Sequence, residues 1–79
     1  MAKPSPLYRG TAELLALGLV IREARQQMGM SQEELAHSAG LDRSYVGGIE
    51  RGEHNVALMS LVKLANALGV TVSDLTKKV

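Results

Sequence analysis

Residues 31–52 read SQEELAHSAGLDRSYVGGIERG, and this stretch indicates the architecture of most of the chain. Its apolar spacing predicts two short helices, one around Leu35 and the other carrying Val46 and Ile49. A tight turn at Gly40 joins them, because a chain that leaves a helix and turns at once usually needs a positive φ. The second helix is then expected to stand out from the body, with its outer face free to enter a groove.

The sequence on both sides of this stretch extends the pattern. Upstream stands LGLVIREARQQMGMSQEELA at residues 17–36, and downstream stand IERG at 49–52 and LVKLANALGV at 61–70. Together these residues resemble the helix-turn-helix of the Cro/phage-repressor (XRE-type) family over residues 17–75. The LDRSYVGGIERGEHN segment, residues 41–55, is also similar to controller proteins of restriction–modification systems, to stand-alone phage repressors and to antitoxins.

The resemblance and the helix signals together predict one all-α, five-helix, lambda-repressor-like DNA-binding domain at residues 11–79. Helices are expected at about 12–28, 32–39, 43–51, 58–68 and 74–77. Caps are expected at Thr11, at Ser31 with Glu34 completing a capping box, at Asp42, and at Ser73 or a neighbour. Residues 1–10 contain two prolines and no periodic pattern, so they are expected to form a flexible N-terminal arm.

Length and composition restrict the function. The chain has 79 residues, which suits one small domain, and a net charge of +1, so a basic stripe would have to provide any attraction to nucleic acid. Two histidines and no cysteine provide no metal-ligand spacing, and no paired carboxylates or glycine-rich phosphate loop stand out. We therefore expect no enzyme, no metal or other cofactor, and no small-molecule ligand.

The longest apolar run, residues 14–21, is far shorter than the roughly 20 residues that span a bilayer. No small-residue cleavage site follows it before Arg22, so it does not resemble a signal peptide. We expect no membrane partner and a cytoplasmic location.

The resemblance implies that the third helix reads DNA bases. Arg43 and Ser44 lie in its first turn, and an arginine suits guanine through paired hydrogen bonds to O6 and N7. Gly47 and Gly48 stand at further base-contact positions, although glycine costs about 1 kcal/mol relative to alanine inside a helix. Two explanations stay open: the bare backbone lets the helix sit deeper in the groove, or a short packed helix simply tolerates the glycines.

Phosphate contacts are implied around the same helix, by Gln32, Tyr45, Arg51, His54 and Asn55. Gln32 begins the second helix, whose N-terminus favours an anion. Arg51 also suits the negative end of its own helix, and the ring of Tyr45 has an alternative role in covering the core. For His54, an exposed loop position without a DNA contact is the stronger interpretation.

Two further sets of residues are assigned to structure and assembly. The resemblance implies a partly buried salt bridge between Arg25 and Glu50. It also implies a homodimer, which we expect to form through the apolar residues of the last segment, with an accessory surface on the first helix. The residues are Val70, Val72 and Leu75 for the last segment and Leu15 and Leu19 for the first helix. An alternative is that the N-terminal arm folds over Leu15 and Leu19.

The expected function is that of a transcriptional regulator that binds duplex DNA sequence-specifically as a homodimer on a roughly palindromic operator. The competing interpretation is a protein-interaction module or antitoxin-like adaptor, in which the helix-turn-helix serves as a docking surface. The low net charge and the paired glycines favour that alternative.

Overall fold

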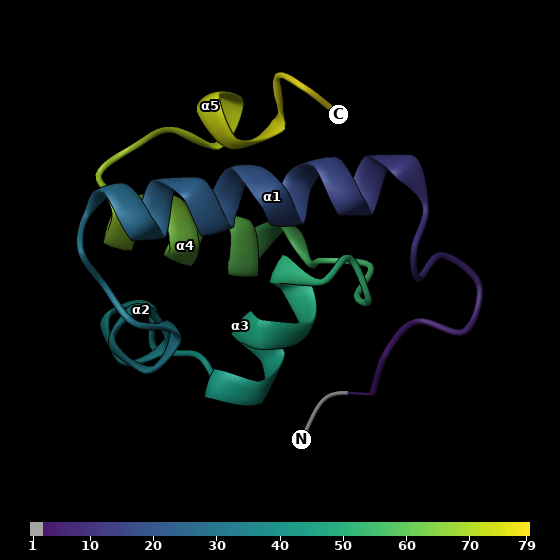
Figure 1. The fold of residues 1–79 in the computed structure, drawn as a ribbon, viewed down its shortest axis with the longest axis horizontal. Helices are drawn as coiled ribbons and strands as arrows, with labels where there is room; N and C mark the ends of the chain where they lie inside the picture. Colours follow the sequence, from purple (N-terminus) through teal and green to yellow (C-terminus); the bar gives the residue numbers. More distant parts are fainter. Residues whose placement is uncertain (1–2) are drawn as a thin grey trace.

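The computed structural model describes residues 3–79 and contains five helices and no strand in that range (Figure 1). The helices are α1 (Ala12–Gln27), α2 (Gln32–Ala39), α3 (Arg43–Glu50), α4 (Leu58–Leu68) and α5 (Val72–Thr76). The expected all-α, five-helix fold is thus confirmed. None of these helices combines the length and the apolar character needed to cross a bilayer.

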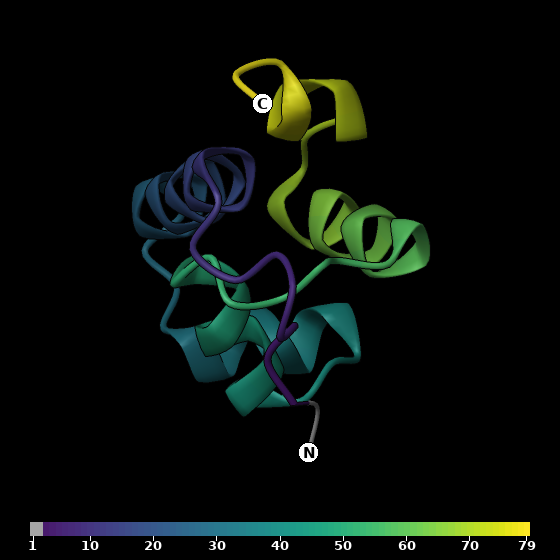
Figure 2. The ribbon, with the colours of Figure 1, turned by 90° about the vertical axis from the view of Figure 1, so that its right-hand side faces the viewer.

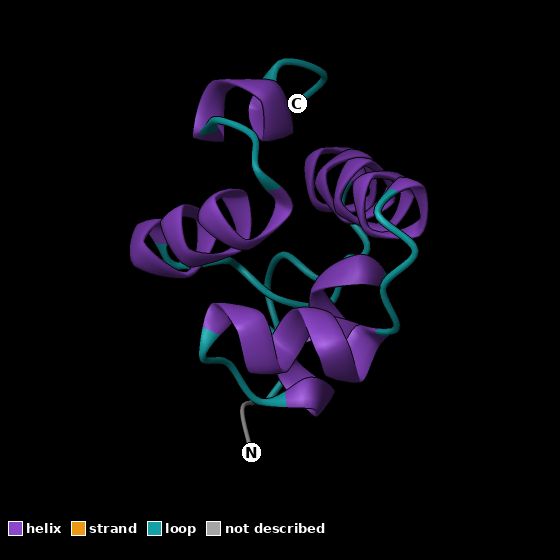
Figure 3. Cartoon of the chain, turned by 90° about the vertical axis from the view of Figure 1, so that its left-hand side faces the viewer, coloured by secondary structure: helices purple, strands orange, loops and turns teal. Residues whose placement is uncertain are grey.

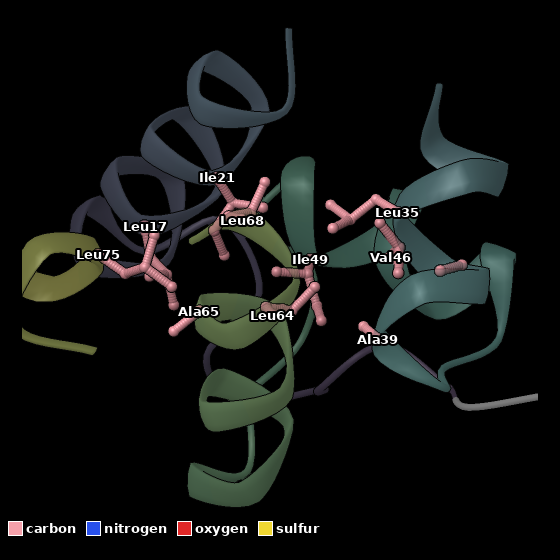
Figure 4. Packing of buried hydrophobic residues seen from close by; sticks show 11 residues of the cluster. Leu17, Ile21, Leu35, Ala39, Val46, Ile49, Leu64, Ala65, Leu68 and Leu75 are labelled. Carbon is pink, nitrogen blue, oxygen red and sulfur yellow. The ribbon is translucent and has the colours of Figure 1, made fainter. Parts of the chain in front are cut away.

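The helices lie at three levels of the molecule. α2 and α3 lie together at one end of the molecule, α5 lies at the other end, and α1 and α4 lie between them (Figure 2, Figure 3). Buried apolar side chains from all five helices meet in one core (Figure 4). They are Leu17, Ile21, Leu35, Ala36, Ala39, Val46, Ile49, Leu64, Ala65, Leu68 and Leu75. Aliphatic side chains therefore fill this core without Phe or Trp.

Three helices begin with a side-chain cap. The Thr11 hydroxyl accepts a hydrogen bond from the Leu14 N–H at 3.5 Å. Ser31 and Glu34 form the expected capping box, in which each side chain accepts from the other residue's backbone N–H, at 3.0 and 2.8 Å. α5 has a second capping box between Thr71 and Asp74, with both hydrogen bonds at 3.0 Å. The cap of α5 is therefore Thr71, two residues before Ser73.

The prediction that the Asp42 side chain caps a helix is wrong. Asp42 occupies the N-cap position of α3, but no side-chain hydrogen bond caps the helix. The Asp42 carboxylate instead accepts a hydrogen bond from the Ser44 hydroxyl at 3.2 Å. The carboxylate is thus engaged by a nearby polar side chain and not by the backbone of α3.

The two capping boxes make the free energy of unfolding depend on pH. The backbone and hydroxyl groups of Ser31 and Thr71 hold the pKa of Glu34 and of Asp74 below their ordinary values of 4.5 and 3.8. Because the folded protein then binds fewer protons than the unfolded chain, this stabilisation is present above those ordinary values and is lost as the pH falls below them through the lowered pKa values of the folded state. Urea unfolding of the Glu34→Gln/Asp74→Asn variant is expected to lose less stability than wild type between about pH 6 and about pH 3. An equal loss in both proteins would contradict this role.

α1 and α3 touch at a glycine. A β-carbon placed on Gly18 would lie 2.5 Å from the carbonyl oxygens of both Ile49 and Glu50, at the end of α3. Since real β-carbons do not approach backbone atoms so closely, the absence of a side chain at Gly18 sets how near α1 lies to α3. This contact fixes the end of α3 relative to the rest of the fold.

The N-terminal arm is tied to the loop that follows α3. The Ser5 N–H donates to the Glu53 carbonyl at 2.8 Å, and the Gly10 N–H donates to the Gly52 carbonyl at 2.7 Å. Met1 and Ala2 lie outside the described residues. The flexibility expected for residues 1–10 stays a prediction, and these two hydrogen bonds argue against it from Ser5 onward.

The arm does not cover the accessory surface of α1. Leu7 and Tyr8 are themselves exposed, and 49% of Leu15 and 55% of Leu19 remain exposed. The alternative in which the arm folds over the two α1 leucines is therefore wrong.

Candidate nucleic-acid interface

α3 presents one face to the core and the other to solvent. Val46 and Ile49 point into the core with Leu35 (Figure 4). Arg43 lies exposed in the first turn, and within residues 3–79 no carboxylate lies within 4 Å of its guanidinium. The leading turn of α3 therefore carries an unpaired, projecting cation on a rigidly packed helix.

The expected pair between Arg25 and Glu50 is present. Arg25 Nε lies 2.7 Å from Glu50 Oε2 and Arg25 Nη2 lies 3.0 Å from Glu50 Oε1. Only 11% of the Arg25 side chain and 3% of the Glu50 side chain are exposed. The hydrogen bonds that Arg25 donates to the Glu50 carboxylate raise the pKa of Arg25. Arg25 Nη1 also donates to the Met30 carbonyl at 2.8 Å, so the pair joins α1, the α1–α2 loop and α3.

Glu50 also orients Gln32. Gln32 Nε2 donates to Glu50 Oε1 at 3.0 Å, which anchors the amide of the first α2 residue beside α3. Gln32 Oε1 then lies over Gly47, 3.3 Å from where a β-carbon would stand, and Arg51 Nη1 lies 3.1 Å from the same point. The structure thus brings two of the expected phosphate-contact side chains, Gln32 and Arg51, together at Gly47, where α3 has no side chain.

Gly48 has a different neighbour. A β-carbon on Gly48 would collide with the imidazole of His54, so packing inside the protein accounts for this glycine and greater depth in a groove does not. The exposure expected for His54 is wrong, since only 6% of it is exposed. Its ring meets the ring of Tyr45 edge to face, with centroids 4.9 Å apart, and the Tyr45 hydroxyl lies 3.4 Å from the Ser60 hydroxyl. Of the two explanations left open for the paired glycines, the packing of a short helix therefore applies to Gly48.

The interpretation of the sequence missed Glu53. Arg51 Nε lies 3.0 Å from Glu53 Oε2, and Arg51 Nη2 lies 3.3 Å from Glu53 Oε1. This hydrogen bonding raises the pKa of Arg51 and lowers that of Glu53. Gly52 between them has φ +75°, a conformation that turns the chain back sharply, so an Arg-Gly-Glu triplet at a helix end was the available signal.

The remaining site residues lie apart. Asn55 is exposed in the loop that follows α3, and Ser44 is engaged with Asp42. Leu75 is a core residue, 1% exposed, so its assignment to a dimer surface is wrong. Val70 and Val72 are half-buried against the core. The start of α4 instead exposes two large apolar side chains, Leu58 and Met59, which the sequence interpretation did not single out.

A model of the family described as helix-turn-helix matches residues 21–75. The chain belongs to this family. Its members are DNA-binding regulators rather than enzymes. Within residues 3–79 no group of three or more His, Cys, Asp or Glu side chains is placed to hold a metal ion.

Individual relatives agree with the family. The chain is 49% identical over 55 residues to a hypothetical transcription factor of Neisseria meningitidis serogroup B, covering 70% of this chain and 52% of that protein. The chain therefore spans about half the length of that relative. The crystal structure of the restriction–modification controller protein C.AhdI from Aeromonas hydrophila superposes with a TM-score of 0.80 at 52% identity, covering 81% of this chain and 97% of the other. SinR, a regulator of biofilm formation solved in complex with DNA, gives a TM-score of 0.72 at 37% identity, covering 75% and 95%.

Proposed function

We propose that this protein regulates transcription by binding duplex DNA sequence-specifically, with α3 placed in the major groove. The observation that carries the proposal is the position of Arg43, exposed and unpaired at the leading turn of a helix whose rear face is wedged into the core. Arg43 would read guanine and Ser44 would contribute a second base contact. The proposal is supported by relatives named as a restriction–modification controller protein and a hypothetical transcription factor, and by SinR, which was solved in complex with DNA. A regulator of cellular DNA would work in the cytoplasm.

Phosphate contacts would set the register of α3 in the groove. Gln32 and Arg51 both lie beside Gly47, where Arg51 would donate to a phosphate oxygen. Gln32 would donate through the second N–H of Nε2, since its other N–H is directed to Glu50 and its Oε1 can only accept. Tyr45 and Asn55 remain further candidates. Burial beneath Tyr45 makes His54 a weaker candidate than its loop position suggested.

A homodimer would place two copies of α3 in successive major grooves, with half-sites about 34 Å apart and a roughly palindromic operator. Val70 and Val72 stay candidates for the interface, and Leu15 and Leu19 stay candidates for an accessory contact. The two exposed residues at the start of α4, Leu58 and Met59, join them, since large exposed apolar side chains often mark a contact surface.

The division of labour between bases and phosphates has a direct test. Arg43→Ala is expected to cost about 1–3 kcal/mol of binding and to relax preference at one base position. Arg51→Ala is expected to weaken all sequences alike and to reduce the salt slope by about 1. Fluorescence anisotropy across a salt series, with a duplex from upstream of the protein's own gene, measures both. Equal effects of the two variants on every sequence would overturn the assignment.

A further inference from the structure

The loop after α3 brings two arginines from segments far apart in the sequence to one carboxylate. Arg51 holds Glu53 through two hydrogen bonds, at 3.0 and 3.3 Å. Arg9 of the N-terminal arm approaches the same carboxylate, with Nη2 3.9 Å from Glu53 Oε2. Arg51 is therefore hydrogen-bonded to Glu53, whereas Arg9 lies only at ion-pair distance from it.

The backbone keeps Arg9 in place without help from its side chain. The hydrogen bonds from Ser5 to Glu53 and from Gly10 to Gly52 fix the arm on both sides of Arg9. The Arg9 side chain itself is mostly exposed and is free to move closer to Glu53.

Glu53 occupies one of the two edges of Arg51 that a phosphate can use. Its carboxylate takes Nε and Nη2, one complete edge of the guanidinium, and leaves Nη1 over Gly47. A phosphate binds arginine most strongly through two parallel hydrogen bonds to one edge. A phosphate that binds the Nε/Nη2 edge of Arg51 therefore competes with Glu53 for the same atoms.

We propose that Glu53 changes its ion-pair partner on DNA binding. When a DNA phosphate binds Arg51, the Glu53 carboxylate leaves Arg51 and pairs with Arg9. Arg51 is 59% exposed and Glu53 23%, and such solvent-exposed ion pairs are weak enough to be exchanged. Without Arg9, the released carboxylate would stand uncompensated beside the phosphate backbone and repel it. Arg9 and Glu53 are thus positioning residues for the contact made by Arg51, and this inference rests on the proposed function.

A double-mutant cycle tests the exchange. Arg9→Gln, Glu53→Gln and the double variant are compared with wild type by anisotropy on one duplex at fixed salt. Arg9→Gln alone is expected to weaken binding about two- to fivefold, a range set by the strength of exposed ion pairs. In the Glu53→Gln background the same change is expected to have no effect, because there is no carboxylate left to neutralise.

The controls separate this coupling from general charge effects. Lys78→Gln removes one positive charge after α5, at the opposite end from α3, and should leave affinity close to wild type (Figure 1). Thermal melts of all variants are compared as well, because Glu53 is only 23% exposed and its substitution must leave the protein folded for the cycle to be interpreted.

The outcomes are distinct. If Arg9→Gln weakens binding equally in both backgrounds, Arg9 contacts DNA itself and the exchange is refuted. If it changes nothing in either background, Arg9 plays no part in binding. If wild type fails to bind any duplex, the proposed function fails and the exchange fails with it.

Discussion

Replacing Arg25 by methionine is expected to lower the free energy of unfolding by about 3–5 kcal/mol, which is the usual cost of breaking a buried ion pair. The variant would leave the Glu50 carboxylate, 3% exposed, with Gln32 as its remaining side-chain partner. It would also release the Met30 carbonyl from Arg25 Nη1 and so loosen the α1–α2 loop. Urea unfolding at neutral pH, followed by circular dichroism, measures the loss.

The double variant Arg25→Met/Glu50→Leu is the matched control. Removing both charges leaves no unpaired carboxylate, and apolar replacements of buried pairs are often close to neutral. We therefore expect the second substitution to recover most of the stability lost in the first. A loss below about 1 kcal/mol for Arg25→Met would show that the pair is no stronger than an exposed one.

Gly18→Ala is the second substitution with a large expected effect. The new methyl group would press on the carbonyl oxygens of Ile49 and Glu50, which belong to backbone and cannot rotate away. Overpacking of this kind costs up to about 3 kcal/mol. Replacing glycine by alanine inside a helix by itself stabilises the fold by about 1 kcal/mol. We expect a net loss near 2 kcal/mol, seen as a lower urea midpoint with an unchanged slope.

Gly47→Ala provides the comparison for that result. Its methyl group would meet the ends of two flexible side chains, Arg51 and Gln32, instead of backbone. Stability should therefore stay within about 1 kcal/mol of wild type, while DNA affinity should fall because both phosphate contacts are displaced. Similar unfolding midpoints for Gly18→Ala and Gly47→Ala would contradict the close approach of α1 to α3.

Local signals in the sequence predicted the helices well. The caps at Thr11 and Ser31 and the glycine turn at Gly40 act within a few residues of chain, and each appears in the structure as expected. The salt bridge between Arg25 and Glu50 depends on contacts across the fold, and only the family resemblance supplied it. The Asp42 carboxylate accepts from Ser44 instead of from the backbone of α3, and the cap pattern alone does not distinguish these two partners.

Contacts between distant segments were the part that local patterns did not predict. Leu75 was assigned to a dimer surface because apolar periodicity does not say whether the covering partner is the same chain or another. The burial of His54 depends on Tyr45 and on the space left by Gly48, which lie in a different element. The pairing of Glu53 with both Arg51 and Arg9 likewise required the path of the arm in three dimensions.

Selection of duplexes from a random library by the wild-type protein, repeated with Arg43→Ala, tests most directly whether α3 reads DNA. We expect wild type to enrich an inverted repeat whose half-sites lie one helical turn apart, about 10 bp from centre to centre. Arg43→Ala should enrich the same repeat with the preference for guanine lost at one position of each half-site. No enrichment by wild type, or an identical motif from both proteins, would contradict the role given to α3.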